Sequence, residues 1–188
     1  HTVAPLAKIL QTYGRDLTLA AARDELDPVI GRSREIVELA RALLQRRKPN
    51  ALLVGEPGVG KTSVVEALAR RIVAPDAGDD IARLRIVELS ITELVAGTKY
   101  RGELEERISA VLEAAEHDPN IVLFIDEIHA VVPAAADSPG SSIAAALKPA
   151  LARGRLRVIG ATTPAEFERH LARDEAFTAL LAEVPDAR

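Results

Sequence analysis

Residues 51–62 read ALLVGEPGVGKT: a four-residue apolar run leads into a glycine-rich turn, and a helical pattern begins near Ser63. Glycines at positions 55, 58 and 60 let the backbone curl so that successive N–H groups point inward at the phosphates of a nucleotide. Lys61 and Thr62 then open the helix, where the helix dipole adds to the lysine charge and the hydroxyl can bind Mg²⁺. The stretch predicts a phosphate-binding loop.

Strands and helices alternate regularly on the C-terminal side of this loop. We expect strands at 51–54, 85–89, 121–125 and 156–159, and helices at 61–73, 103–116, 143–152 and from residue 165 onward. Near-continuous apolar strands that alternate with helices are typical of a parallel sheet covered on both faces. The sequence therefore predicts an α/β fold with three layers, in which helices flank the sheet.

The segment before the loop has a different pattern. Helical spacing at Ala4–Tyr13 and Leu17–Leu26 predicts two short helices before Asp27-Pro28, so we divide the chain into a helical prefix at 1–30 and an α/β domain at 31–188 that carries the phosphate-binding loop. Ser33 is expected to cap the next helix, which ends in the cations of Arg46–Lys48. These cations suit a helix C-terminus, and a nucleic-acid patch is the alternative.

Composition narrows the class of protein. The net charge of −4 argues against a general grip on nucleic acid or on an acidic membrane surface. The absence of cysteine excludes disulfides and thiolate metal sites and fits a reducing compartment, and no apolar run is long enough to span a bilayer, so we expect a cytoplasmic protein. No methionine occurs, so we expect an excised domain or a processed fragment.

Polar residues follow two later strands. Asp126 and Glu127 come directly after the apolar strand 121–125, where ligands of open α/β sheets bind, and they suit a metal-holding residue and a general base, respectively. Thr162 and Thr163 follow strand 156–159, and one hydroxyl either contacts the γ-phosphate or caps the helix that starts at Pro164. The sequence has no guanine-reading NKxD motif, so ATP is the better prediction.

Five motifs together resemble the first ATPase module of Clp-type AAA+ unfoldases and disaggregases. They are LDPVIGR at 26–32, GEPGVGKT at 55–62, VAGTKYRGELEER at 95–107, LFIDEIH at 123–129 and LKPALARGRLRVIGATT at 147–163. The resemblance extends from about Tyr13 to Asp174. It implies the large αβα subdomain of an AAA+ P-loop NTPase, with a five-stranded sheet whose last strand lies around Glu183-Val184, working as a hexameric ring.

The resemblance also implies roles for individual residues. Val29 and Ile30 contact adenine, Thr62 and Asp126 hold Mg²⁺, and Lys61, Asp126, Glu127 and Thr163 act on the terminal phosphate. The residues implied to hold ATP in the loop are Gly55, Pro57, Gly58, Val59, Gly60, Lys61, Thr62 and Ser63.

A second implied site contacts polypeptide. The KYRG segment, Lys99–Gly102, lines the central pore of the family's rings, and Tyr100 is expected to grip an unfolded or aggregated polypeptide. An aromatic side chain on a loop offers contact area without demanding a particular sequence. Ser90 and Glu93 are spaced as a capping box on a short helix that leads into this segment. A partner protease or adaptor is left open.

Three departures from the family pattern affect the functional prediction. Ala179 and Leu180 occupy the positions of two arginines that reach the neighbouring subunit's ATP in the family, the second pore loop at 133–146 differs, and the 188 residues do not include the small helical lid. We therefore consider an ATP-driven protein-unfolding motor first and a nucleotide-binding regulatory or scaffold module with weak hydrolysis second. A nucleic-acid motor is third, because the charge balance offers no track for phosphates.

Overall fold

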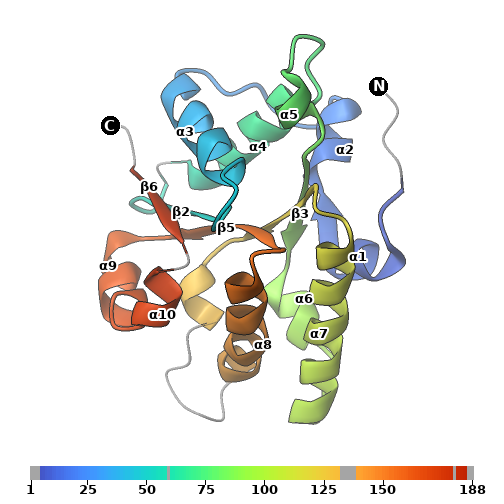
Figure 1. Cartoon of the computed structure of the whole chain (residues 1–188), viewed down its shortest axis with the longest axis vertical. Helices are drawn as coiled ribbons and strands as arrows, with labels where there is room; N and C mark the ends of the chain where they lie inside the picture. The colour runs from blue at the N-terminus through green and yellow to red at the C-terminus, as the bar shows by residue number, and fades with distance from the viewer. Residues whose placement is uncertain (1–4, 59, 132–138, 180, 186–188) are drawn as a thin grey trace.

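A computed structural model describes residues 5–58, 60–131, 139–179 and 181–185, so residues 1–4, Val59, 132–138, Leu180 and 186–188 lie outside the described residues. Six strands form one sheet in the order β1-β3-β4-β5-β2-β6 (Figure 1). All neighbouring strands are parallel except β1 and β3, which are antiparallel. The strands are β1 (Gly14–Asp16), β2 (Ala51–Val54), β3 (Arg85–Leu89), β4 (Ile121–Ile125), β5 (Arg157–Thr162) and β6 (Ala182–Pro185).

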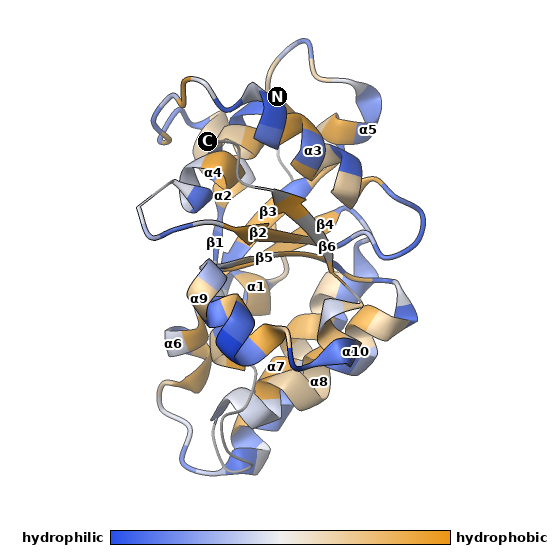
Figure 2. Cartoon of the chain, turned by 90° about the vertical axis from the view of Figure 1, so that its left-hand side faces the viewer, coloured by the Kyte–Doolittle hydropathy of each residue, from blue (hydrophilic) through white to orange (hydrophobic). Residues whose placement is uncertain are grey.

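Helices cover both faces of the sheet, which gives the three predicted layers (Figure 2). One face carries α2 (Leu17–Ala22), α3 (Ser33–Leu43), α4 (Lys61–Ile72) and α5 (Asp79–Ala82). The other face carries α1 (Lys8–Tyr13), α6 (Ile91–Val95), α7 (Arg101–His117), the short 3-10 helix η1 (Ile128–Val131), α8 (Pro139–Arg153), α9 (Pro164–Glu166), the π-turn η2 (Phe167–Leu171) and α10 (Glu175–Thr178).

Alternate residues of the central strand β4 pack into two separate hydrophobic cores, one on each face of the sheet. Val122 and Phe124 pack with the α2–α4 layer, whereas Ile121, Leu123 and Ile125 pack with the layer that contains α7 and α8. Successive side chains of a strand point to opposite faces, so a strand between two helical layers is apolar throughout. This explains the continuous apolar run at 121–125, all of which is buried.

The N-terminal prefix belongs to the sheet and not only to its covering. The two short helices predicted there are present, but Gly14–Asp16 between them forms β1, a strand beyond the five predicted, and pairs with β3. Gly14 is needed at this point because a Cβ there would lie 2.6 Å from Val87 Cγ1. Asp16 both caps α2, accepting from the Leu19 amide at 3.0 Å, and forms an ion pair with Arg85.

Several predicted element ends differ from the structure: α1, α2 and α8 span 8–13, 17–22 and 139–153, whereas 4–13, 17–26 and 143–152 were predicted. Three further differences concern α3, α7 and β5. Ser33 is the first residue of α3 and not its cap, because Arg32 occupies the cap position without a side-chain capping bond. Helix α7 begins at Arg101, two residues before the predicted start. Strand β5 continues beyond residue 159 to Thr162, because its last residues pair with β2.

The parallel arrangement brings three strand ends to one edge. In the sheet β5 lies between β4 and β2, with Ile125 opposite Gly160 and Thr162 opposite Val54. The segments that leave these carboxyl ends are therefore neighbours. Within the described part of the chain, no helix is both long and apolar enough to cross a membrane.

Candidate functional site: a nucleotide edge at the ends of three strands

The phosphate-binding loop joins β2 to α4. Gly58 and Gly60 have φ angles of 85° and 87°, in the left-handed region that glycine adopts without strain. Gly60 occupies the cap position of α4, and a Cβ there would lie 3.3 Å from Arg32 Nη2. The loop therefore has the tight turn predicted from its glycines, and it lies at the start of a 12-residue helix whose dipole favours an anion.

Lys61 folds back over this loop. Its Nζ donates to the carbonyl oxygens of Gly55 at 2.7 Å and Glu56 at 3.2 Å. Thr62 and Ser63 follow in the first turn of α4, and both are half-buried. The lysine charge, the helix start and the threonine hydroxyl are thus gathered around one turn, as the sequence predicted.

Arg32 is a charged residue near the phosphate-binding loop, and no role was predicted for it from the sequence. It precedes α3, lies beside Gly60 and forms an ion pair with Glu35, whose carboxylate Oε1 is 3.4 Å from Arg32 Nη1. The feature of the sequence that could have pointed to Arg32 is its position at the end of the LDPVIGR motif. The same segment carries the two predicted adenine contacts: Val29 is half-buried, and Ile30 is 95% exposed.

Asp126 and Glu127 form a tight turn directly after β4. Both residues are exposed, and Asp126 Oδ1 accepts from the Glu127 amide at 2.9 Å. Glu127 has a φ of 51°, which costs free energy in a residue with a Cβ and persists only where surrounding contacts enforce it. Below the turn, Ile128 is fully buried against Gly160, where a Cβ would come within 2.7 Å of Ile128 Cδ1.

The two threonines after β5 have different partners. Thr163 is the cap of α9 and accepts from the Glu166 amide at 3.2 Å, so the capping alternative is confirmed for this residue. A hydroxyl that accepts one bond still has a proton to donate, so capping is compatible with a contact to phosphate. Thr162 is 2% exposed, and its hydroxyl lies 2.9 Å from Nδ1 of His129.

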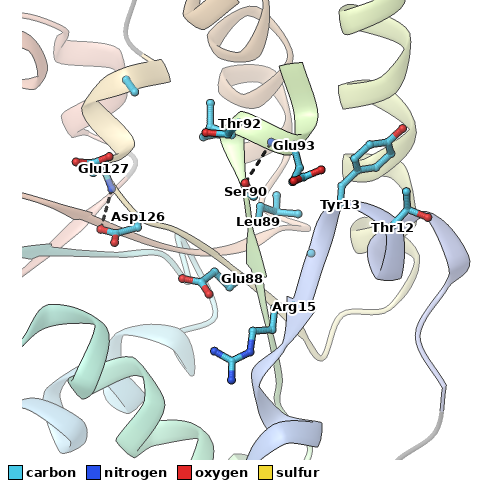
Figure 3. A pocket seen from close by; sticks show the side chains of 13 residues that line it. Thr12, Tyr13, Arg15, Glu88, Leu89, Ser90, Thr92, Glu93, Asp126 and Glu127 are labelled. Atoms are coloured by element: carbon cyan, nitrogen blue, oxygen red, sulfur yellow. Dashed lines mark hydrogen bonds between the residues drawn. The ribbon is translucent and has the colours of Figure 1, made fainter. Parts of the chain in front are cut away.

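A cavity of about 580 Å³ lies on the β3 side of the acidic turn (Figure 3). The N-terminal prefix, the end of β3 and the acidic turn line it, with residues Thr12–Arg15, Glu88–Glu93, Asp126, Glu127 and Ala130. Glu88 lies between Arg15 and Asp126 in this view. Burial raises the pKa of Glu88, the carboxylates of Asp126 and Glu66 raise it further, and Arg15 opposes them.

The oxygen donors at this edge suit a hard cation. Thr62 offers a hydroxyl and Asp126 an exposed carboxylate, which are ligand types that Mg²⁺ prefers. The described residues contain no group of three or more His, Cys, Asp or Glu side chains arranged to hold a metal on their own. Mg²⁺ commonly binds through one or two carboxylates together with phosphate oxygens, so these residues fit an ion carried by a nucleotide.

The KYRG segment lies at the start of α7, which covers the face of the sheet opposite to α4 (Figure 2). Tyr100 is the residue before the helix and is 71% exposed, whereas Arg101 and Gly102 are already helical. The segment before it is anchored: Arg107 Nη1 donates to the carbonyl oxygens of Leu94 and Ala96, each at 2.8 Å. Within the segment, Arg101 contacts Glu105 and, on α8, the hydroxyl of Ser141 at 3.3 Å.

The helix that leads into the KYRG segment has half of the predicted capping box. Ser90 Oγ accepts from the Glu93 amide at 3.2 Å. The Ser90 amide instead donates to the Tyr13 carbonyl at 3.3 Å, because β1 extends alongside β3 here. The second bond of a capping box, from the Ser90 amide to the Glu93 carboxylate, is therefore replaced by the bond to Tyr13.

Ala179 lies at the C-terminal end of α10 and is exposed. Asp174 caps this helix, accepting from the Phe177 amide at 3.1 Å, and pairs with Lys148 of α8. Burial alone would raise the pKa of Asp174, but the hydrogen bonds from Lys148 and the Phe177 amide outweigh it and hold that pKa below its ordinary value of 3.8.

Comparison with known proteins supports the family predicted from the motifs. The sequence profile described as "ATPase family associated with various cellular activities (AAA)" matches residues 51–181. The chain is 49% identical over 182 residues to the chaperone protein ClpB 2 of Parasynechococcus marenigrum, covering 94% of this chain and 20% of that protein. It is 47% identical over 167 residues to a probable ATP-dependent Clp protease ATP-binding subunit of Chlamydia pneumoniae, covering 89% of this chain and 20% of that protein. The chain thus spans about a fifth of the length of these relatives.

Solved structures give the same relationship. The S. cerevisiae Hsp104–ADP complex matches with a TM-score of 0.83 at 42% identity, covering 95% of this chain and 25% of that chain. The S. cerevisiae Hsp104:casein complex in its extended conformation matches with a TM-score of 0.83 at 41% identity, covering 96% and 31%, respectively. The resemblance to Clp-type AAA+ proteins and the P-loop fold are therefore confirmed.

Proposed function

The chain belongs to the ATPase family associated with various cellular activities, and from this premise we propose that it is the ATP-binding and ATP-hydrolysing module of a Clp-type protein unfoldase or disaggregase. One observation carries the proposal: the phosphate loop, the strained acidic turn and Thr163 leave three neighbouring parallel strands at the same edge. Ligands of open α/β sheets bind at such an edge.

Binding of ATP is assigned to the loop and the segment before α3. Backbone amides of residues 55–60 and the Lys61 ammonium would hold the phosphates, and Val29 and Ile30 would contact adenine. The high exposure of Ile30 is consistent with a side chain that a ligand covers, since large apolar side chains are rarely left so open. Thr62 and Asp126 would hold Mg²⁺, which neutralises charge on the phosphates when bound.

Hydrolysis is assigned to Glu127, with support from Thr163. Glu127 is exposed on a turn with a fixed backbone, so its carboxylate can orient a water molecule and accept its proton. The Thr163 hydroxyl retains a proton to donate towards the terminal phosphate. Lys61 supplies positive charge where negative charge accumulates as the phosphoryl group is transferred.

Contact with the polypeptide that ATP hydrolysis would move is assigned to the KYRG segment. Tyr100 offers an exposed aromatic surface beside an anchored segment, which suits contact with an unfolded or aggregated polypeptide of any sequence. The proposal includes a hexameric ring in the full-length protein. It also includes a cytoplasmic location, supported by the absence of cysteine from the chain.

Steady-state ATP turnover of the full-length protein tests the proposal. Wild type is compared with Glu127→Gln, and ATP binding to both is measured by calorimetry. We expect Glu127→Gln to bind ATP normally and to turn it over at least a hundredfold more slowly, which is the usual size of a general-base contribution. Equal turnover in the two proteins would contradict the assignment.

A regulatory or scaffold module is the second candidate, and Ala179 favours it. An arginine supplied across a subunit interface is worth about 10³–10⁵ in phosphoryl-transfer rate, and alanine at 179 has no charge to supply. If this candidate is right, ATP binds but turns over near background. Replacing both Ala179 and Leu180 by arginine then raises turnover at least tenfold, and no gain would reject the missing arginines as the cause.

A further inference from the structure

Thr162 connects two parts of the nucleotide edge. It is the last residue of β5 and is almost fully buried. Its hydroxyl bonds Nδ1 of His129, three residues after Asp126, at 2.9 Å. Its carbonyl accepts from the amide of Gly55, the first residue of the phosphate loop, at 3.1 Å. The Gly55 carbonyl in turn accepts from Lys61 Nζ, so a continuous chain of hydrogen bonds runs from His129 to the loop lysine.

The surroundings of His129 define how this bond is made. Nε2 of the ring lies 3.9 Å from a carboxylate oxygen of Glu166, and the ring stacks on His170 with centroids 6.3 Å apart. A carboxylate near Nε2 favours the tautomer with its proton on that nitrogen. In that tautomer Nδ1 is the acceptor and the Thr162 hydroxyl is the donor of their hydrogen bond.

The turn that carries Glu127 is held by contacts with the neighbouring strand β5. The Glu127 side chain is exposed, so the point from which it projects is set by the backbone of the turn, and that backbone has an unfavourable φ of 51°. Inside the turn, the Ala130 amide donates to the Glu127 carbonyl at 2.8 Å. Two contacts attach the turn to β5: Ile128 packs against Gly160, and His129 bonds to Thr162.

We propose that His129 is a positioning residue for ATP hydrolysis: through its hydrogen bond with the Thr162 hydroxyl, it holds the Glu127 turn in register with the phosphate loop. This inference rests on the proposed function. His129 does not touch the reacting atoms. Its effect is to keep the backbone of Glu127 at a fixed distance from the phosphate that Gly55 and Lys61 hold, and a misplacement of about 1 Å in such a site can cost about a hundredfold in rate.

A partly buried hydrogen bond can also contribute to stability alone, so the variants separate the position of the acceptor from its presence. His129→Asn keeps an acceptor close to the place of Nδ1, whereas His129→Gln moves the acceptor out by one carbon. Thr162→Val removes the hydroxyl at nearly constant shape, and Thr162→Ser retains it. His129→Asn and Thr162→Ser are therefore the conservative variants, and each serves as the control for the other variant at its position.

The kinetic test uses the full-length protein. We expect kcat to fall about 10- to 100-fold in His129→Gln and in Thr162→Val, with KM for ATP within threefold of wild type. His129→Asn and Thr162→Ser recover at least a third of wild-type kcat. The His129→Gln/Thr162→Val double variant is no slower than the slower single variant, because both remove one bond. Unchanged kcat in the single variants, or multiplicative losses in the double variant, would overturn the inference.

A second readout separates failure of the inference from failure of the proposed function. If wild-type turnover does not exceed that of Glu127→Gln, the proposed function fails, and amide hydrogen exchange with ATP bound then decides the inference. We expect faster exchange across 126–131 and across 55–60 in His129→Gln and Thr162→Val than in their conservative counterparts. Faster exchange confined to one of these segments, or in neither, would show that His129 does not couple them.

Discussion

The nucleotide edge and the KYRG segment place their side chains by opposite means. At the nucleotide edge, Glu127 depends on a strained turn held by the buried residues Ile128 and Thr162, and close contacts leave no room for a larger residue at Gly160. In the KYRG segment, Tyr100 projects into solvent while Arg107 anchors only the chain before it. On the proposed function, chemistry that is identical in each cycle uses the fixed edge, and contact with a variable polymer uses the exposed side chain.

The largest expected effect is at Lys61. Because its ammonium is the cation held within the loop, Lys61→Ala is expected to weaken ATP binding about a hundredfold, or about 2.7 kcal/mol, as for loss of a hydrogen bond to a charged group. Calorimetric titration measures this change. Lys8→Ala, at an exposed position of α1, is the matched control and retains wild-type affinity. Equal weakening in both variants would point to a general charge effect.

The next effect tests how tightly the acidic turn is held. Gly160→Ala places a methyl group against Ile128 and is expected to lower the free energy of unfolding by about 1–3 kcal/mol through overpacking. Adding Ile128→Val removes the Cδ1 atom that meets the new methyl group, and recovers part of the loss. Gly78→Ala, which adds a methyl group in open space at a φ of −62°, is the control and stays within about 0.5 kcal/mol of wild type in urea unfolding.

A smaller effect is expected at Asp174, which joins α8 to α10. Asp174→Ala removes both the cap and the charge and is expected to cost about 1 kcal/mol, whereas Asp174→Asn keeps the cap and costs less. Because the folded-state pKa lies below the ordinary value of 3.8, the charge contributes stability above that pH. The contribution is lost as the pH falls through the folded-state pKa.

Urea unfolding midpoints at about pH 7 and about pH 3 measure this change. The gap between wild type and Asp174→Asn narrows at the lower pH. A gap that stays constant or widens on acidification would show that the carboxylate charge is not what stabilises the folded protein here.

Much of the fold and of the nucleotide edge follows from local sequence. The alternation of apolar strands and helices predicts the three layers, and the parallel topology alone brings 55–62, Asp126 and Thr163 to one edge. Strand β1 was missed because three residues, Gly14–Asp16, carry no apolar alternation, and their pairing depends on a close approach to Val87 far along the chain. Local patterns cannot report such contacts.

The parts of the site that were not predicted also depend on contacts between residues that are far apart in the sequence. Arg32 lies beside Gly60 only because the segment before α3 folds over the loop, and His129 meets Thr162 only because β4 and β5 are neighbours. The extension of β5 to Thr162 decides which of two adjacent threonines is buried in the sheet and which caps α9. Propensity alone favours capping by either residue.

One paired measurement tests the contrast between the two regions most directly. ATP turnover and ATP-driven translocation of a fluorescent, permanently unfolded polypeptide substrate are measured for wild type, Tyr100→Ala and Glu127→Gln in the full-length protein. We expect Glu127→Gln to lose both activities at least a hundredfold and Tyr100→Ala to keep ATP turnover within threefold while polypeptide processing falls at least tenfold. Parallel loss of both activities in Tyr100→Ala, or retained turnover in Glu127→Gln, would contradict the account.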